Sequence, residues 1–231
     1  MLKVQDLSLH YGQSQILFDV SLEAEKGAVT CLMGVNGVGK TSLLKAICGV
    51  HPRTAGTVSL EGRDLPSGPA QDIAQAGVAY VPQGREVFPL LTVRENLETG
   101  FGCLPRSEKR VPDEIYELFP ILKDMSDRRG GDLSGGQQQQ LAIGRALITK
   151  PTLLLLDEPT EGIQPNIIAQ IGKVIAYLRD EGRMAVLLVE QYFDFAYGLA
   201  DQIYAMRRGE ISFQGARKDM PRDELLAAVA I

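Results

Sequence analysis

The residues best suited to chemistry form one glycine-rich stretch, which reads Gly34, Val35, Asn36, Gly37, Val38, Gly39, Lys40, Thr41 and Ser42. An apolar run, 29–33, precedes it, and a second apolar segment, 43–47, follows it. This order predicts a strand, a turn and the start of a helix. Glycines allow the backbone of such a turn to point its N–H groups at an anion, and the helix N-terminus adds partial positive charge. The stretch therefore predicts a loop that binds nucleotide phosphates.

Three side chains of this loop are suited to separate parts of the binding. Lys40 is expected to reach the β- and γ-phosphates, the Thr41 hydroxyl to bind Mg²⁺, and the Ser42 hydroxyl to contact the α-phosphate. The alternative is a tight strand-to-helix turn without a ligand. Such a turn requires neither Lys40 nor Thr41, so the presence of both at this spacing favours the phosphate loop.

An acidic pair, Asp157 and Glu158, directly follows the apolar run 153–156. At the carboxyl edge of a parallel sheet and beside a phosphate loop, Asp157 is placed to hold Mg²⁺ through water. Glu158 can orient or deprotonate an attacking water, which is the chemistry of nucleotide hydrolysis. On its own, such a pair is also typical of a helix cap or a turn, and the phosphate loop is what favours the catalytic interpretation.

A further motif begins a predicted helix and consists of Ser134, Gly135, Gly136 and Gln137. Ser134 is a suitable N-cap, and capping alone is the simplest role for it. Gly135 and Gly136 are each weaker helix formers than alanine by about 1 kcal/mol. Their position at the start of the helix predicts a close approach of the backbone to an anion.

The elements that must position these residues form a strand-based core with a helical insertion, so the predicted fold class is α/β. Alternating apolar residues predict antiparallel strands at 2–10 and 16–23, with further strands at 56–61 and 77–81. The pattern is helical from about 91 to 150, in the segments 92–99, 113–119 and 135–149. Strands at 152–157 and 184–190 flank a helix at 165–181, which is typical of a parallel sheet. The tail predicts closing strands within 203–213 and a helix at 222–229.

Composition excludes several other classes of protein. The 231 residues are 45% hydrophobic and 23% charged, which is ordinary for a globular domain and argues against disorder. The net charge of −5 and the absence of a basic arm predict no nucleic-acid partner. The apolar runs are too short to cross a bilayer, and no secretory signal pattern begins the chain, so a cytoplasmic location is expected. Cys31, Cys48 and Cys103 share no metal-ligand spacing and are expected to be free thiols.

In combination, the three motifs resemble those of ATP-binding cassette (ABC) proteins, and the resemblance covers essentially the whole chain. It implies a P-loop NTPase (RecA-like) core with N-terminal antiparallel strands and an inserted helical subdomain at about 91–150, all within a single ATPase domain over residues 1–231. It also implies ATP and Mg²⁺ as ligands. By the same resemblance, Ser134 and the backbone of the glycines after it meet the γ-phosphate of a nucleotide held by a partner cassette.

The resemblance also implies roles for residues outside these motifs. Tyr11 matches the aromatic residue that stacks on adenine, and the less favoured alternative is an aromatic residue that only ends a strand. Gln83 matches the glutamine that contacts Mg²⁺ and the attacking water. The segments around it, 84–89 and 92–97, are expected to line a groove for a helix of a membrane subunit.

Two positions differ from the common pattern of the family. Gln164 stands where a carboxylate is usual in the loop after the acidic pair, and Gln191 stands where a histidine usually contacts the γ-phosphate. An amide can donate a hydrogen bond to phosphate but cannot carry positive charge. We therefore expect slower hydrolysis at this chain's own site, with a non-identical cassette supplying a more active one.

Within the family, the segments 80–85, 159–165 and 189–196 resemble ATPase subunits of bacterial uptake systems, closest to those for urea and short-chain amides and next to those for branched-chain amino acids. The resemblance implies two membrane permease subunits, a second cassette that is either non-identical or a copy of this chain, and a periplasmic binding protein as an indirect partner. The chain would then lie on the inner face of the cell membrane. A non-transport ABC ATPase and a regulatory nucleotide-binding subunit are the alternatives from other classes.

Overall fold

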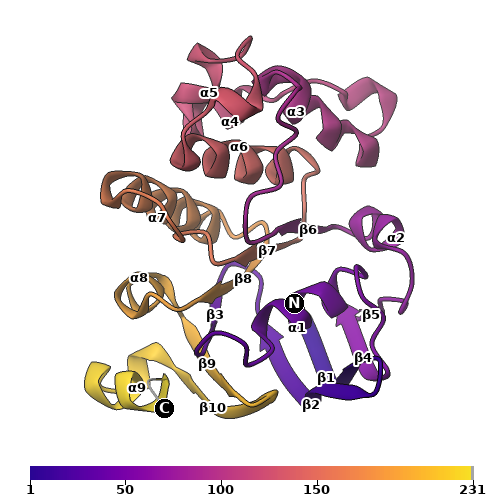
Figure 1. Ribbon diagram of the computed structural model, residues 1–231, viewed down its shortest axis with the longest axis vertical. Coiled ribbons are helices and arrows are strands. Elements are labelled where there is room, and N and C mark those ends of the chain that lie inside the picture. Colours follow the sequence, from indigo (N-terminus) through magenta and orange to yellow (C-terminus); the bar gives the residue numbers. More distant parts are fainter. Residues whose placement is uncertain (230–231) are drawn as a thin grey trace.

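A six-stranded sheet forms the centre of the protein in the computed structural model, which describes residues 1–229 (Figure 1). Its order is β10-β9-β3-β8-β7-β6, and all neighbouring pairs are parallel except β10 with β9. The strands are β3 (Val29–Met33), β6 (Val78–Val81), β7 (Leu153–Asp157), β8 (Ala185–Glu190), β9 (Gln202–Arg207) and β10 (Glu210–Ala216). Every residue of β3, β7 and β8 is buried, which explains their continuous apolar sequences.

A second, four-stranded antiparallel sheet has the order β2-β1-β4-β5. Its strands are β1 (Leu2–Tyr11), β2 (Ser14–Ala24), β4 (Ala55–Leu60) and β5 (Arg63–Asp64). Helix α1 (Lys40–Ile47) lies between the two sheets, because its apolar face shares one buried cluster with residues of β1, β2, β7 and β8. The predicted antiparallel strands at the N-terminus are thus present.

Apart from the short helix α2 between β5 and β6, the remaining helices fall into two groups (Figure 1). The segment between β6 and β7 contains α3 (Val93–Glu98), α4 (Asp113–Leu118), α5 (Pro120–Asp124) and α6 (Gly135–Ile148), with 3₁₀ turns at Thr99–Cys103, Arg106–Glu108 and Gly130–Asp132. The second group, α7 (Pro165–Asp180), α8 (Phe193–Leu199) and α9 (Arg222–Val229), contributes to the buried cluster on the other face of the central sheet. A 3₁₀ turn, Arg217–Asp219, precedes α9. Among residues 1–229, no helix is both long enough and apolar enough to span a bilayer.

The elements that the sequence did not predict are short or lie beside a tight turn. Helices α2 (Ala70–Gln75), α5 and α8 have five to seven residues, which is too few for a clear helical period. The segment 203–213 contains parts of two strands joined at Arg208 and Gly209, both with positive φ. Two adjacent residues with positive φ are the geometry of a tight hairpin turn.

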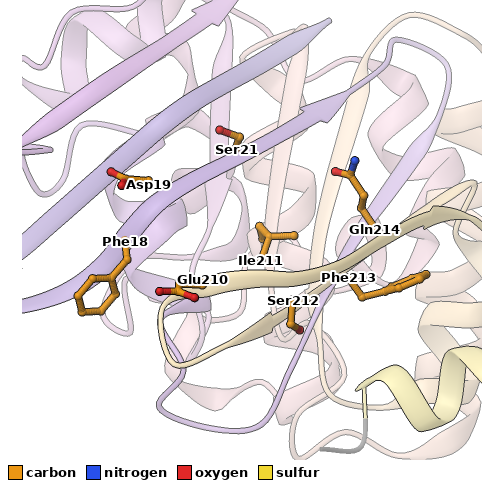
Figure 2. Close-up of a pocket in the computed structure, with 8 residues that line it drawn as sticks. All are labelled: Phe18, Asp19, Ser21, Glu210, Ile211, Ser212, Phe213 and Gln214. Atoms are coloured by element: carbon orange, nitrogen blue, oxygen red, sulfur yellow. The ribbon is translucent and has the colours of Figure 1, made fainter.

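Figure 2 shows a groove between the edge strands β2 and β10, about 570 Å³ in volume. The backbone N–H of Phe18 donates to the carbonyl of Gly209 at 3.0 Å, which joins β2 to the turn between β9 and β10. The groove is lined by Phe18, Asp19, Ser21 and residues 210–214, none of which the sequence analysis assigned to a site.

Candidate nucleotide-binding site

The glycine-rich stretch connects β3 to α1 as predicted. Gly34, Gly37 and Gly39 all have positive φ, at 154°, 81° and 113°. A Cβ atom on Gly39 would lie 2.7 Å from Cδ2 of Leu17, so a larger residue would be both strained and crowded there. Helix α1 begins at the next residue, Lys40, and its N-terminus therefore opens onto the turn.

Lys40 is buried, with 4% of its surface exposed, and its ammonium group is held by the loop itself. Nζ donates to the carbonyls of Gly34 at 2.7 Å and Val35 at 3.0 Å. It also lies 3.4 Å from Oε1 of Glu158. The cation is thus held beside the turn by partners that a phosphate group can replace.

Asp157, the last residue of β7, accepts hydrogen bonds on both carboxylate oxygens. Thr41 Oγ1 donates to Oδ1 at 3.2 Å, and Tyr80 Oη donates to Oδ2 at 3.0 Å. Burial is the main cause that raises the pKa of Asp157, and the two hydrogen bonds oppose it. The structure therefore joins the phosphate loop to the acidic pair through Thr41 and Asp157, two of the three residues predicted to bind Mg²⁺.

Glu158 has a left-handed backbone, with φ at 47°, and its N–H donates to the carbonyl of Val189 at 2.9 Å. Its Oε2 accepts a hydrogen bond from Nε2 of Gln191 at 2.6 Å. Strained conformations of this kind cost about 1–3 kcal/mol and gather at functional sites. Gln191, predicted to act at the γ-phosphate, thus contacts the candidate general base directly.

A cleft of about 300 Å³ brings most of the predicted ligands together. It is lined by Tyr11, Ile16, Asn36, Gly37, Gly39, Lys40, Thr41, Ser42, Gln83 and Glu158. Tyr11 is 42% exposed, and the centre of its ring lies 4.4 Å from the centre of the His51 ring. An exposed aromatic ring at the mouth of a phosphate cleft is suited to stacking on a base. Val38 lines no part of this cleft, because its side chain is buried in the core.

Gln83 lies at the edge of the cleft and contacts the loop that follows β7. Its Nε2 donates to Oε2 of Glu161 at 3.0 Å, and the guanidinium of Arg85 donates to the carbonyl of the same residue at 3.0 Å. The side chain predicted to contact Mg²⁺ and the attacking water is therefore held by Glu161 in this structure.

The Ser134 motif lies outside the cleft that contains Lys40. Ser134 caps α6 through reciprocal hydrogen bonds with Gln137, and both residues line a separate hollow of about 640 Å³ together with Gln164. Arg85 packs against Gly135, where a Cβ atom would lie 2.8 Å from its guanidinium, and Ile167 packs against Gly136. The absence of side chains at Gly135 and Gly136 thus makes room for Arg85 and Ile167. The anion contact that the sequence predicts at these glycines stays a prediction.

Comparison with known proteins identifies the family. A family model described as ABC transporter matches residues 17–161. The chain is 46% identical over 212 residues to the high-affinity branched-chain amino acid transport ATP-binding protein BraG of Pseudomonas aeruginosa, covering 91% of each chain. This chain belongs to the ABC transporter family. It is also 36% identical to the probable branched-chain amino acid transport ATP-binding protein LivF of Archaeoglobus fulgidus, covering 97% of this chain and 95% of the relative.

The fold and activity predicted for an ABC cassette are confirmed. The structure is similar to the ADP conformation of MJ1267, an ATP-binding cassette of an ABC transporter, with a TM-score of 0.84 and 28% identity over 98% of this chain and 94% of that one. The P-loop NTPase core, the antiparallel strands and the helical subdomain are the ABC cassette fold, and the chain is a transport ATPase of this family.

The donor atoms at the cleft fit Mg²⁺, which prefers oxygen ligands and keeps several waters or phosphate oxygens. Thr41 and Gln83 line this cleft, and the Thr41 hydroxyl contacts the buried carboxylate of Asp157 behind it at 3.2 Å. Within residues 1–229, no group of three or more His, Cys, Asp or Glu side chains is arranged to hold a metal ion. A cation here would therefore depend on few protein ligands and on the phosphates of the substrate.

Sequence reasoning missed several residues of this ABC cassette. Tyr80 contacts Asp157 from the neighbouring strand β6, and Glu190 ends β8 as Asp157 ends β7. A charged residue at the end of an apolar strand is a signal that could have identified Glu190. Tyr80 and Glu161 carry no comparable local signal, because their partners lie about eighty residues away in the sequence.

Proposed function

We propose that this chain is the ATP-hydrolysing subunit of a bacterial importer for branched-chain amino acids. The observation that carries the catalytic part is the single cleft in which Lys40 and Glu158 lie 3.4 Å apart beside Thr41 and Gln83. A phosphate loop, a cation and a general base are the parts that hydrolysis of a nucleoside triphosphate requires.

In this proposal, Lys40 exchanges its contacts with the loop carbonyls and Glu158 for the β- and γ-phosphates of ATP. Release from Lys40 leaves the Glu158 carboxylate free to accept a proton from the attacking water, while Gln191 keeps it oriented. When bound, Mg²⁺ would neutralise charge on the phosphate oxygens, and Thr41, Gln83 and Asp157 are the residues proposed to hold it.

The position of the Ser134 motif supports a site shared between two cassettes. Ser134, Gly135, Gly136 and Gln137 begin α6 and do not line the cleft that contains Lys40. Their backbone N–H groups can reach a γ-phosphate only if another cassette presents one. We infer that two cassettes, either copies of this chain or non-identical ones, close head to tail around ATP.

A groove of about 580 Å³ supports contact with a membrane subunit. It lies between β6 and α6 and is lined by residues that include Tyr80, Glu86, Val87, Phe88 and Arg145. Phe88 is 48% exposed, and the guanidinium of Arg145 lies 5.4 Å from the centre of its ring. An exposed aromatic ring beside a groove of this size is suited to the end of a partner helix. We propose that two permease subunits dock here, so that the cassette lies on the cytoplasmic face of the membrane.

The cargo is inferred from the relatives alone, because none of the motifs in this chain contacts it. BraG and LivF are both named for transport of branched-chain amino acids. They favour this cargo over urea, the closer match by the sequence motifs. A periplasmic binding protein would then deliver the amino acid to the permeases.

The test is uptake into membrane vesicles that contain this chain, its cognate permeases and the binding protein. ATP-dependent accumulation of labelled leucine, lost in Glu158→Gln, is the expected result. Accumulation of labelled urea in place of leucine would refute the proposed cargo and leave the proposed role as a transport ATPase standing. ATP hydrolysis stimulated by nucleic acid, without association with a permease, would overturn the importer altogether.

A further inference from the structure

Glu190, the last residue of β8, is a buried carboxylate outside the predicted phosphate site. Only 2% of its surface is exposed. Oε1 accepts from the backbone N–H of Thr160 at 3.1 Å and from its hydroxyl at 2.8 Å. Oε2 accepts from the backbone N–H groups of Gln191 at 3.1 Å and Tyr192 at 3.3 Å. The carboxylate is thus the common acceptor for four donors.

These donors belong to two different loops. Thr160 lies in the loop that follows β7, two residues after Glu158, and is itself 8% exposed. Gln191 and Tyr192 lie in the loop that follows β8. The two strands are neighbours, with Asp157 opposite Val189 in the register. One carboxylate oxygen therefore faces each loop at the point where the strands end.

We propose that Glu190 is a positioning residue that fixes the distance between the Glu158 carboxylate and the Gln191 amide by joining the loops that carry them. The inference rests on the proposed function of the same site. It explains how Gln191 Nε2 is held 2.6 Å from Glu158 Oε2 although the two residues are 33 positions apart in the sequence.

Only an ionised carboxylate of this length satisfies both loops. Glutamine at residue 190 has the same shape, but its amide group would place N–H donors against either Thr160 or the backbone N–H groups of the second loop. Aspartate is shorter by one methylene and cannot reach both sets of donors from the same backbone. Glu190→Gln is therefore the informative substitution. It keeps the volume of the side chain and removes the hydrogen bonds from residue 190 to one of the two loops.

The experiment is a double-mutant cycle on the cassette assembled with its permeases in vesicles. It measures kcat and KM for MgATP in wild type, Glu190→Gln, Gln191→Ala and the double variant. We expect Glu190→Gln to lower kcat about tenfold with KM changed less than about twofold, and the double variant to be no slower than the slower single variant. Losses in kcat that multiply would overturn the proposal, as would a change in KM alone.

A readout that does not require hydrolysis is hydrogen exchange of the full-length chain. The amides of Thr160, Gln191 and Tyr192 are expected to exchange faster in Glu190→Gln, whereas Glu210→Gln, an exposed position on β10, leaves them unchanged. Unchanged exchange in Glu190→Gln would overturn the proposal. A wild-type complex without ATP hydrolysis would instead overturn the proposed function, and the exchange data would still show whether Glu190 joins the loops.

A second substitution keeps the test decisive if Glu190→Gln does not fold. Thr160→Val retains the shape of the side chain and removes one of the four donors to Glu190. Thr160→Val is expected to lower kcat less, on the order of threefold. Combined with Gln191→Ala, it is expected to give a double variant no slower than the slower of the two single variants. Full additivity of these two variants would contradict a shared role.

Discussion

Glu158→Gln is expected to leave ATP bound and almost unhydrolysed, because the substitution removes the proposed general base and keeps the shape of the side chain. The Glu158 carboxylate accepts a hydrogen bond from Gln191 Nε2 at 2.6 Å and lies 3.4 Å from Lys40 Nζ. An amide at this position can still accept the bond from Gln191 through its oxygen. It cannot take a proton from water at neutral pH.

Two free energies set the expected magnitude. A positioned general base contributes about 10²–10⁴-fold to the rate, which equals about 2.7–5.4 kcal/mol of activation free energy. The charges of Lys40 and Glu158, 3.4 Å apart, attract each other by about 5 kcal/mol at an effective dielectric constant of about 20, and the cost of burying both charges offsets much of this. Lys40 keeps the carbonyls of Gly34 and Val35 as acceptors, so the variant leaves no unpaired buried cation. We therefore expect kcat to fall at least about a hundredfold while affinity for ATP is kept or rises.

The assay compares single-turnover hydrolysis of MgATP with nucleotide binding, on the cassette assembled with its permeases. ATP-dependent closure of two cassettes, followed by cross-linking, is expected to persist in Glu158→Gln. Glu210→Gln, on the exposed surface of β10, is the matched control for loss of one carboxylate. Hydrolysis within about twofold of wild type would exclude Glu158 as the general base and refute the reasoning.

Three further predictions concern the glycine-rich loop, Gln191 and the pH dependence of stability. Gly39→Ala is expected to abolish ATP binding in calorimetry and to cost about 1–3 kcal/mol of stability, because φ is 113° and its Cβ atom would lie 2.7 Å from Leu17; binding at wild-type affinity would contradict this. Gln191→His is expected to raise ATP turnover of the assembled complex several-fold by supplying a group that can carry positive charge, and unchanged turnover would disprove the role assigned to Gln191. Burial raises the pKa of Glu190 in the folded state by more than its four hydrogen bonds lower it, so ionising the carboxylate that joins the two loops costs free energy, and stability falls as pH rises from about 4.3 through the raised value. The stability advantage of wild type over Glu190→Gln in thermal unfolding should therefore shrink as pH rises above about 4.3, and an advantage that grows with pH would show that the sign is wrong.

The phosphate loop and the acidic pair were predictable because each is a local pattern. Three glycines between an apolar strand and a helix have few alternatives, and Gly34, Gly37 and Gly39 do adopt the positive φ that the loop requires. The run of leucines before Asp157 predicted a strand buried on both faces, and β7 is such a strand. The order of strands and helices after residue 150 likewise predicted the parallel sheet.

Gln191 is a residue whose type the sequence shows and whose contact in the folded chain it does not. The sequence indicated that an amide replaces the usual histidine, and from this we predicted slower hydrolysis. It gave no sign that the amide contacts Glu158, because that contact depends on the register of β7 against β8. The same register brings Glu190 within reach of Thr160.

The sequence by itself determined the family, the core of the fold and most residues that line the cleft beside the glycine-rich loop, because short segments with fixed spacing carry that information. The tertiary structure alone decided which side chains contact the proposed catalytic and metal-binding groups: Tyr80 on Asp157, Gln191 on Glu158, Glu161 on Gln83, and Glu190 across two loops. Each of these contacts joins loops or strands far apart in the sequence. Their geometry is fixed by the packing of neighbouring strands, and no local pattern of residues encodes it.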